Sequence, residues 1–460
     1  MKNIKIWWQS CKGLNNILNL YSLTFIYLFL PLSVLVYYAT PKRAKNAILV
    51  LISLSFYTMA EPKYLPLMVG SVLFDYCASR LIESFDTKEK VRKVLMLFVL
   101  IKNALLVILL SSFTQNRELW RPLGVMIYAI TSLGYTLDVY KRETQCEHNL
   151  IDFALFCVLY VKLPAGPLVR WNELRDQIKD RRPSLSMISD GVVLYIQGLA
   201  KKVIIGSTMT SIYDRLAAFT PSEQSVVSSW LMTAALAFAI YFNLSSLCDM
   251  ARGLAKIYSI ELPRNFCYPY QSRSITEFVS RFNITVSKFF RAYLPERLRG
   301  TPLTGTAMVL NIGIVTLFWG VWFGFRVNFI IWGLYFVLFQ LLEQLGLGTT
   351  LKKIPVLFSR LYTFAVVLLS FVIFAGNNVD QSIRYFTTML GLGNPKLYTD
   401  PAMYIASSNY ILLILACIFC TNLASTILAK LRKKVPVFSE LLSSVLNAVL
   451  LLLSTAFLLV

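Results

Sequence analysis

Histidine, the side chain that most often acts as a general base in enzymes, occurs only once in these 460 residues. That residue, His148, lies in a polar loop. A loop histidine cannot serve a reaction centre in an apolar interior unless the loop folds deep into the core. The sequence therefore offers no ready histidine base for a buried active site.

Eight cysteines are scattered along the chain, most of them in apolar stretches. Cys248 stands next to Asp249 and could carry an acyl group as a thioester, but apolar surroundings disfavour the thiolate. An ion pair between Asp249 and Arg252 is the simpler interpretation. Cys417 and Cys420 form a C-x-x-C pair, a spacing used in redox and metal chemistry. Because no histidine or second pair accompanies them, we expect small buried residues and no metal site.

The segment Leu262–Arg299 is too polar to cross a membrane, yet it is rich in phenylalanine. If Ile275–Leu294 forms one helix at about 100° per residue, Asn283 lies roughly opposite a basic stripe, with Ser287 toward the edge of its face. The stripe consists of Arg281, Lys288 and Arg291. One face would then meet phosphate or carboxylate headgroups while Asn283 points inward. The alternative is an interfacial helix with snorkelling cations.

A shorter amphipathic segment, Val169–Arg182, places Trp171, Leu174 and Ile178 on one helical edge with basic residues around them. This pattern is typical of a helix that lies in a membrane interface. The alternative is a solvated charged loop.

These polar segments interrupt a strongly apolar chain, in which 56% of residues are hydrophobic and 15% are charged. That composition excludes a soluble globular domain. A span needs about 20 mostly apolar residues, so we expect about 11 crossings, plus helices that enter without crossing. No cleavable signal peptide is evident. The apolar stretches are Tyr21–Tyr38, Asn46–Met59, Tyr64–Leu81, Val94–Ser112, Pro122–Leu137, Ile151–Leu163, Val192–Ile205, Val227–Leu244, Val309–Phe323, Phe329–Leu345, Leu361–Phe374, Tyr410–Leu428 and Leu441–Val460.

The net charge of +21 indicates membrane topology rather than nucleic-acid binding, because the basic residues sit in short loops. These residues form four clusters, which are Lys42/Arg43/Lys45, Lys88/Lys90/Arg92/Lys93, Lys141/Arg142 and Lys430/Arg432/Lys433/Lys434. Two spans separate each of the first three clusters from the next, so all three can lie in the cytoplasm. This arrangement puts the N-terminus outside.

Three charged residues lie within or near the spans, where a charge is costly and is usually paired. They are Asp75, Lys102 and Asp138. Lys102 can pair with Asp75; the alternative is that Lys102 snorkels toward the membrane surface.

Ordered motifs along most of the chain resemble the membrane-bound O-acyltransferase family, in particular its bacterial branch that acetylates alginate or D-alanylates teichoic acid. The most specific run consists of Leu262-Pro263-Arg264-Asn265-Phe266, Pro269-Tyr270, Ser274-Ile275-Thr276-Glu277-Phe278 and Arg281-Phe282-Asn283-Ile284-Thr285-Val286-Ser287. Other matching runs are Phe29-Leu30-Pro31-Leu32, Leu54-Ser55-Phe56-Tyr57, Ala60-Glu61-Pro62-Lys63, Leu137-Asp138-Val139-Tyr140, Leu163-Pro164-Ala165-Gly166-Pro167-Leu168-Val169-Arg170, Gly198-Leu199-Ala200-Lys201-Lys202-Val203, Cys248-Asp249-Met250-Ala251 and Asn328-Phe329-Ile330-Ile331-Trp332-Gly333.

The resemblance implies an all-α polytopic membrane protein, with one membrane-embedded domain over residues 1–460. The family uses two polar residues in the membrane interior. The first follows an Arg-aromatic pair and corresponds to Asn283. The second is a histidine in a Trp-His-Gly context, thought to take a proton from the acceptor hydroxyl, and its place is held by Phe323. The resemblance assigns substrate binding to Arg281, Ser287, Asp249, Trp322 and Asn328, and expects the two central side chains to approach each other.

The chain departs from the family pattern at polar positions. Phe323 has no group that can accept a proton, and general-base catalysis typically contributes roughly 10²–10⁴-fold, or about 3–5 kcal/mol of barrier. The family's Phe-Asp-Phe-Ser-Gly becomes Phe242-Asn243-Leu244-Ser245-Ser246, and an Arg-Asp-Tyr becomes Arg291-Ala292-Tyr293. Together these changes favour relaxed or redirected chemistry.

Three functions remain open. The first is a catalytically degenerate family member that acts as scaffold, regulator or substrate conduit in the modification of a cell-surface polymer. The second is a working O-acyltransferase with a substituted mechanism, and the third is a transporter or channel that reuses the fold. We expect no bound cofactor, with acyl-CoA or an acyl-carrier protein as donor if the chain is active.

The resemblance also implies a location and a set of partners. We expect the bacterial cytoplasmic membrane, contact with membrane lipids and no nucleic acid. Protein partners would be an extracellular or membrane-anchored acyltransferase, a carrier protein, or an intact, histidine-bearing paralogue.

Overall fold

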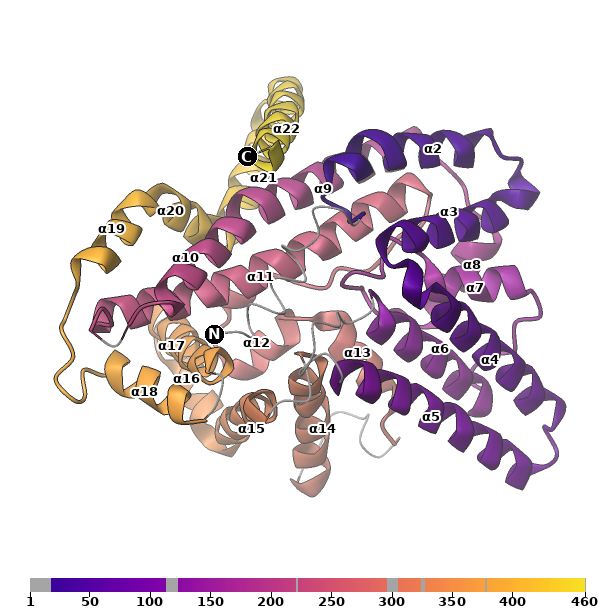
Figure 1. The fold of residues 1–460 in the computed structure, drawn as a ribbon, viewed down its shortest axis with the longest axis horizontal. Helices are drawn as coiled ribbons and strands as arrows, with labels where there is room; N and C mark the ends of the chain where they lie inside the picture. The colour runs from indigo at the N-terminus through magenta and orange to yellow at the C-terminus, as the bar shows by residue number, and fades with distance from the viewer. Residues whose placement is uncertain are drawn as a thin grey trace. The chain divides into compact units, whose positions relative to one another are not determined.

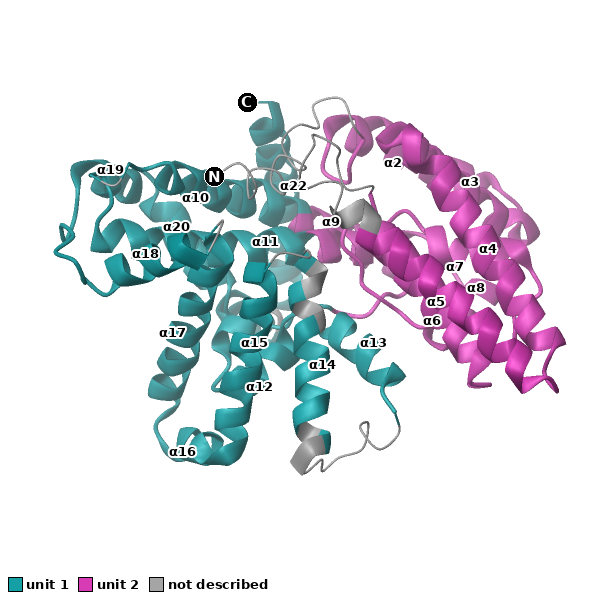
Figure 2. Ribbon diagram, turned by 60° about the horizontal axis from the view of Figure 1, so that its bottom comes forward, with its two compact units in different colours: residues 1–9, 199–246, 265–460 teal, residues 10–198, 247–264 magenta. Residues whose placement is uncertain are grey.

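A computed structural model describes residues 18–112, 123–220, 222–295, 305–323, 327–376 and 379–459, and every regular element in these ranges is a helix (Figure 1). The all-α prediction is therefore confirmed for the described chain. Two compact units make up the structure, and both are discontinuous in sequence (Figure 2). Unit 1 comprises Met1–Gln9, Leu199–Ser246 and Asn265–Val460, and unit 2 comprises Ser10–Gly198 and Leu247–Arg264.

Unit 2 is a helical bundle in which α4 packs on α5 and α6, and α3 packs on α7. Its helices are α2 (Leu30–Ala39), α3 (Lys45–Ala60), α4 (Leu65–Ser84), α5 (Glu89–Ser112), α6 (Val125–Tyr140), α7 (Leu150–Val158), α8 (Trp171–Lys179) and most of α9 (Leu185–Ala200).

A buried ion pair holds α4, α5 and α6 together. Asp75 is fully buried, and its carboxylate lies 2.8 Å from the Nζ atom of Lys102. It also accepts hydrogen bonds from Ser132 Oγ at 2.5 Å and from Asn103 Nδ2 at 3.2 Å. The predicted pairing of Lys102 with Asp75 is therefore confirmed, and three donors compensate a carboxylate that would otherwise be costly to bury.

The segment from Asn149 to Arg170 turns back on itself. The helix α7 has nine residues, about 14 Å, which is half the thickness of a hydrocarbon core of roughly 30 Å. At the far side of the turn, Arg170 pairs with Asp138 at 2.6 Å and with Glu143 at 2.5 Å. Because Glu143 lies just before Asn149 in sequence, the segment begins and ends at the same end of unit 2. This is the geometry expected of a helix that enters without crossing.

The turn between α3 and α4 lies at the opposite end of unit 2 and carries a partly buried carboxylate. Glu61 Oε2 accepts a hydrogen bond at 2.7 Å from the backbone N–H of Leu123, which immediately precedes the N-cap residue of α6. Burial raises the pKa of Glu61 to about 7, although the hydrogen bond from Leu123 by itself lowers that pKa. Glu61 lies just before the candidate span that begins at Pro62.

Unit 1 contains the remaining helices. They are α10 (Ser207–Ala217), α11 (Val226–Ile257, of which Val226–Ser246 belongs to unit 1), α12 (Ile275–Arg281), α13 (Ile284–Tyr293), α14 (Gly305–Phe323), α15 (Val327–Leu342), α16 (Gly348–Lys353), α17 (Val356–Ala375), α18 (Val379–Met389), α19 (Asp400–Ser408), α20 (Tyr410–Phe419), α21 (Leu423–Lys434) and α22 (Pro436–Leu459). Helices α14, α15 and α17 pack in succession. A Cβ atom on Gly320 would collide with the carbonyl of Phe329, so only glycine permits this close approach of α14 and α15.

Six helices in the described chain are long and apolar enough to cross a membrane, or seven if the bent pair α19 and α20 forms one broken span. The expected count of about 11 crossings is not confirmed. The difference arises because several apolar stretches form short helices. Each of α3 and α6 has 16 residues, about 24 Å, which is less than the hydrocarbon thickness.

The predicted helical edge of the segment Val169–Arg182 is confirmed by α8, in which Trp171, Leu174 and Ile178 are all buried. The indole of Trp171 packs edge-on against Phe156, with ring centroids 5.1 Å apart. The apolar edge of α8 is thus covered by unit 2 itself. That α8 lies in a membrane interface stays a prediction.

Candidate active site

The expected helix over Ile275–Leu294 is wrong, because the chain forms two helices that break at Phe282 and Asn283. Asn283 adopts a left-handed conformation, with φ 53° and ψ 50°. Asparagine tolerates this conformation better than most residues. Helical periodicity cannot reveal such a break, since it depends on one backbone angle and not on the spacing of apolar residues.

The first helix of this pair, α12, is held by charged and polar groups at its N-terminus. Glu343 is buried, and its carboxylate accepts hydrogen bonds from the backbone N–H groups of Ile275 at 2.5 Å and Thr276 at 2.9 Å. The Ser274 hydroxyl accepts a hydrogen bond from the N–H of Glu277. A carboxylate at a helix N-terminus satisfies otherwise unpaired N–H groups and interacts favourably with the helix dipole. The start of α12 is therefore fixed in position.

A pair of buried asparagines forms the turn between α12 and α13. Asn265 Oδ1 accepts hydrogen bonds from the backbone N–H of Thr285 at 2.9 Å and from its hydroxyl at 2.8 Å. Asn265 Nδ2 must then be the donor in the contact of 2.9 Å to Asn283 Oδ1. This arrangement sets the orientation of the Asn283 amide, whose Nδ2 group donates no hydrogen bond within the described residues. Asn283 is 5% exposed, which confirms that it points inward.

Asn265 was not predicted as a site residue. It occurs in the quoted run Pro263-Arg264-Asn265-Phe266, so the motif contained it. Its function, however, requires contact with residues about 20 positions away in the sequence, and spacing alone does not show that contact.

The predicted basic stripe is divided by the helix break. Arg281 ends α12 and lies 2.6 Å from Glu277 in an ion pair of the same helix. Lys288 and Arg291 are exposed on α13, so a single continuous stripe is wrong. Ser287 is buried, and its backbone N–H donates to the carbonyl of Asn283 at 3.2 Å.

Phe323, which stands where the family has its histidine, is packed into an aromatic cluster at the end of α14. Its ring is 4% exposed. It packs edge-on against Trp332 at 5.6 Å and Phe374 at 5.2 Å, and it also contacts Phe329. The site is therefore filled with hydrocarbon and has no titratable group at that position.

A continuous series of ring contacts connects the two central positions of the family. The centroid separations are 5.4 Å for Phe278–Phe282, 5.8 Å for Phe278–Phe336, 4.9 Å for Trp332–Phe336 and 5.6 Å for Phe323–Trp332. Phe282 immediately precedes Asn283, so both positions belong to one aromatic core of unit 1. That the side chains of Asn283 and Phe323 approach each other directly stays a prediction.

Two further predicted substrate-binding residues lie near Phe323 in sequence. Asn328 is buried, and its Nδ2 group donates to the carbonyls of Gly376 at 2.6 Å and Ile373 at 3.2 Å. These carbonyls lie at the C-terminus of α17, where the helix itself provides no donor for them. The side chain of Trp322 lies outside the described residues. The amide of Asn328 thus has a structural partner in place of a substrate.

Asp249 and Cys248 belong to unit 2, whereas Asn283 and Phe323 belong to unit 1. The predicted ion pair is confirmed, with Arg252 Nη1 lying 3.4 Å from Asp249 Oδ1. The thiol of Cys248 is buried and donates to the carbonyl of Ala165 at 3.6 Å. These contacts fit structural roles better than covalent catalysis.

Asn243 stands where the family has the aspartate of its acidic motif. Asn243 is buried in α11 and accepts a hydrogen bond from the buried ammonium of Lys202. Its Nδ2 group donates to the carbonyl of Ala239 at 2.7 Å. An aspartate here would be a counterion for Lys202, so the asparagine has replaced a charge partner by a neutral acceptor.

Cys417 and Cys420 of the C-x-x-C pair are both free cysteines in the structure. Cys420 is buried and donates to the carbonyl of Cys417 at 3.1 Å, whereas Cys417 itself is exposed. The prediction of buried small residues thus holds for Cys420 and is wrong for Cys417.

The single histidine lies beside a polar groove at the end of unit 2 that carries the first three basic clusters. The side chain of His148 is 66% exposed, and its Nε2 atom lies 3.3 Å from Glu83. Burial disfavours ionisation of nearby Glu147, but hydrogen bonds from Lys179 and from the backbone N–H groups of Asn149 and His148 lower its pKa. His148 is therefore a surface residue of a charged loop.

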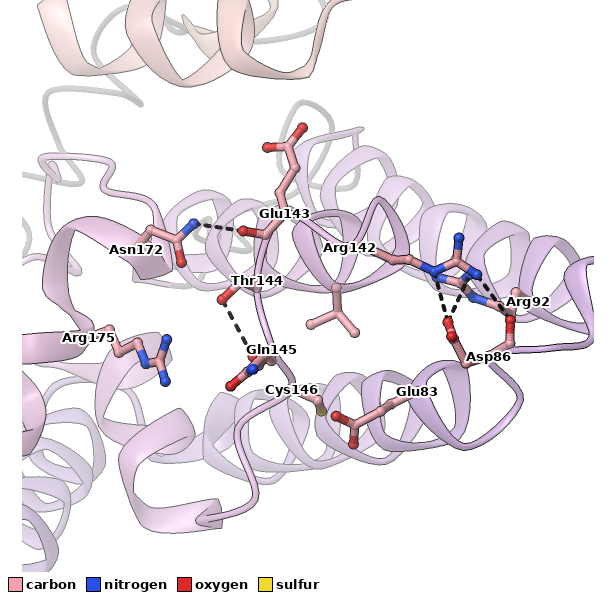
Figure 3. Close-up of a pocket in the computed structure, with 11 residues that line it drawn as sticks. Glu83, Asp86, Arg92, Arg142, Glu143, Thr144, Gln145, Cys146, Asn172 and Arg175 are labelled. Atoms are coloured by element: carbon pink, nitrogen blue, oxygen red, sulfur yellow. Dashed lines mark hydrogen bonds and ion pairs between the residues drawn. The ribbon is translucent and has the colours of Figure 1, made fainter.

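The larger part of this groove has a volume of about 490 Å³ and is bounded by the ends of α4 and α6, the following loop and α8 (Figure 3). Asp86 lies at one side and pairs with Arg142 at 2.9 Å and with Arg92 at 3.2 Å (Figure 3). The groove was not predicted. Two of its residues, Arg92 and Arg142, come from two of the basic clusters, and their contacts with Asp86 place these clusters at one end of unit 2, as the topology prediction requires.

Comparison with known proteins agrees with this architecture. The model of the membrane-bound O-acyltransferase family matches residues 54–380. The probable alginate O-acetylase AlgI of Pseudomonas fluorescens is 30% identical over 374 residues, which cover 80% of this chain and 75% of the relative. The peptidoglycan O-acetyltransferase of Helicobacter pylori is 29% identical over 81% of this chain and 80% of the relative. The teichoic acid D-alanyltransferase of Bacillus subtilis is 26% identical over 43% of this chain and 52% of the relative.

The family model covers most of the chain, and the three relatives are named for acyl transfer to alginate, peptidoglycan and teichoic acid. The apolar helices agree with an integral membrane protein. The chain belongs to the membrane-bound O-acyltransferase family.

Proposed function

We propose that this chain is a catalytically degenerate member of its family that does not transfer acyl groups on its own. It would act as scaffold, regulator or substrate conduit in the O-acylation of a cell-surface polymer. The observation that carries this proposal is the environment of Phe323. A phenyl ring that is 4% exposed and packed edge-on against Trp332 and Phe374 neither accepts a proton nor leaves space for a group that could.

The rest of the chain supports the same conclusion. His148, the single histidine, is exposed and pairs with Glu83 in the charged loop of unit 2. The amide of Asn283 is oriented by Asn265 and can donate a hydrogen bond to a substrate oxygen. An amide does not act as a base near neutral pH. Asn283 would therefore still orient a substrate but would not remove a proton from it.

The proposal extends to location and partners. We place the protein in the bacterial cytoplasmic membrane with its first three basic clusters in the cytoplasm. Catalysis would then be supplied by a partner, either a histidine-bearing paralogue or a separate extracellular or membrane-anchored acyltransferase. The donor used by that partner would be acyl-CoA or an acyl-carrier protein.

The test is an acyl-transfer assay on the purified full-length protein, with and without the products of neighbouring genes, using labelled acetyl-CoA or acyl-carrier protein and polysaccharide acceptors. We expect no transfer by the unmodified chain alone. Phe323→His is the substitution most expected to restore transfer, because a general base typically contributes roughly 10²–10⁴-fold. Phe329→His is the matched control, since it places an imidazole in the same aromatic cluster away from the family position.

A working acyltransferase with a substituted mechanism is the second candidate, and the oriented Nδ2 group of Asn283 favours it. Under this alternative, Asn283 would position the acceptor, while the leaving group of the donor or a partner protein would remove the proton. Transfer by the unmodified chain at a rate that Phe323 substitutions leave unchanged would exclude the degenerate enzyme. The search for another base would then start at Asp249 and Cys248.

A further inference from the structure

Helix α21 exposes apolar side chains along its length and basic side chains at its C-terminal end. At about 100° per residue, Leu423, Ile427, Leu428 and Leu431 fall within one arc of the helix. Three of these side chains are strongly exposed, at 51% for Leu423, 57% for Ile427 and 45% for Leu428. The protein itself therefore leaves much of the apolar face of α21 uncovered.

The last turn of α21 carries four basic residues in five positions, which are Lys430, Arg432, Lys433 and Lys434. The three lysines are exposed, and none has an ion-pair partner within the described residues. No aspartate or glutamate occurs anywhere between residues 401 and 439. The basic cluster at the start of α5, in contrast, has acidic residues beside its lysines. They are Glu83, Asp86 and Glu89. The charge at the end of α21 is therefore not neutralised locally.

The position of α21 in the chain sets its depth. It precedes α22, a candidate span of 24 residues whose apolar window is only 17% buried, and the two helices pack on each other at the C-terminal end of the chain (Figure 1). The turn between them, at Val435 and Pro436, lies at one end of that span. The basic residues of α21 are thus at the level where phospholipid headgroups begin.

The polar edge of α21 is tied to the loop that precedes α12. Ser425 Oγ and Tyr268 Oη are 3.1 Å apart, and Gln271 Nε2 donates to Asn422 Oδ1 at 3.0 Å. These bonds use the polar edge near the start of the helix. They leave the leucine and isoleucine side chains, together with the C-terminal lysines, free to face the membrane surface.

We propose that α21 lies in the plane of the membrane surface and binds anionic phospholipids. The phosphodiester groups would contact Lys430, Lys433 and Lys434, while Leu423 and Ile427 enter the boundary between headgroups and acyl chains. Charge complementarity selects the ligand, because a zwitterionic headgroup does not offset the charge of three exposed lysines that have no ion-pair partner within the described residues. This inference does not depend on whether the chain is an active enzyme.

The test is a lipid titration of the detergent-purified full-length chain, read by native mass spectrometry. Phosphatidylglycerol and phosphatidylethanolamine are compared on the unmodified protein and on the triple variant Lys430→Gln/Lys433→Gln/Lys434→Gln. Each cation near an anionic surface strengthens binding roughly fivefold, so the triple variant should bind phosphatidylglycerol on the order of 100-fold more weakly. It should also lose the preference for the anionic lipid.

The matched control is Lys88→Gln/Lys90→Gln/Lys93→Gln, which removes the same charge from exposed positions of the acid-containing cluster. This control should bind phosphatidylglycerol as the unmodified protein does. A triple variant of α21 that keeps full affinity, or a control that loses as much, would overturn the proposal.

The apolar face has its own test. Ile427→Ser should weaken phosphatidylglycerol binding while leaving the charge unchanged, and soluble glycerol phosphate should not displace the bound lipid at equal concentration. Displacement by glycerol phosphate would mean that α21 binds phosphate alone and does not lie in a membrane, which contradicts the proposal.

Discussion

Glu61→Gln should remove a pH dependence from the stability of this protein. Burial raises the pKa of Glu61 from its ordinary value of 4.5 to about 7. The folded state therefore binds the proton more tightly than the unfolded state. This contribution to stability is complete below pH 4.5 and is lost as the pH rises through 7.

The magnitude follows from the shift. A difference of about 2.5 pKa units, at roughly 1.36 kcal/mol each, corresponds to about 3 kcal/mol between pH 4.5 and pH 8.5. For a chain of this length, that free energy is equivalent to about 3 °C in melting temperature. Glutamine keeps an oxygen that can accept the N–H of Leu123 but carries no charge at any of these pH values.

The assay is thermal unfolding of the detergent-purified protein at intervals between pH 4.5 and pH 8.5. The unmodified protein and the control Glu261→Gln, at an exposed carboxylate, should lose this stability as the pH rises from 4.5 to about 7. Glu61→Gln should lose about 3 °C less over the same range. Equal loss in all three proteins would refute the reasoning, because the raised pKa of Glu61 could not then be the cause.

Three further substitutions test buried polar contacts through the melting temperature. Lys102→Met should destabilise the fold by about 3–5 kcal/mol, because it leaves the fully buried carboxylate of Asp75 without its cation, and Lys102→Arg should recover much of that loss. Asn243→Asp should lower the melting temperature, because the carboxylate loses the hydrogen bonds that the amide donates to the carbonyls of Ala239 and Gly206; a rise would show that the charge pair with Lys202 outweighs them. Asn265→Ala should cost about 2–4 kcal/mol, since it leaves buried donors at the start of α13 unpaired; a neutral effect would show that the turn does not depend on this side chain.

Sequence predicted those features that follow from the cost of burying charge or from helical spacing. The pairing of Asp75 with Lys102 could be predicted because a lone charge in an apolar bundle is expensive, and only a few partners were available. The buried edge of α8 could be predicted because Trp171, Leu174 and Ile178 recur at helical spacing. Both features depend on local pattern and on general physical costs.

Features set by single backbone angles or by distant contacts could not be predicted in this way. The break at Asn283 depends on a left-handed residue that Asn265 holds from 18 positions away, and helical periodicity runs through it without interruption. The number of crossings depends on where helices end, as in the nine residues of α7. Apolar composition alone does not distinguish such a short helix from part of a full span.

The discontinuous order of the two units has a consequence for synthesis of the chain. The core of unit 2 includes Tyr258, whose hydroxyl lies 2.7 Å from Ser33 Oγ and 3.1 Å from Tyr160 Oη, and whose carbonyl accepts from Tyr37. Tyr258 belongs to the segment Leu247–Arg264, which is made only after Leu199–Ser246 of unit 1. A nascent chain that ends at Gly198 would therefore lack the Tyr258 contact of Tyr160, and Ser33 and Tyr37 would each lack one of their two partners. Unit 2 cannot finish folding until the translocation machinery has already accepted α10 and most of α11, so the two units must mature together and not one after the other.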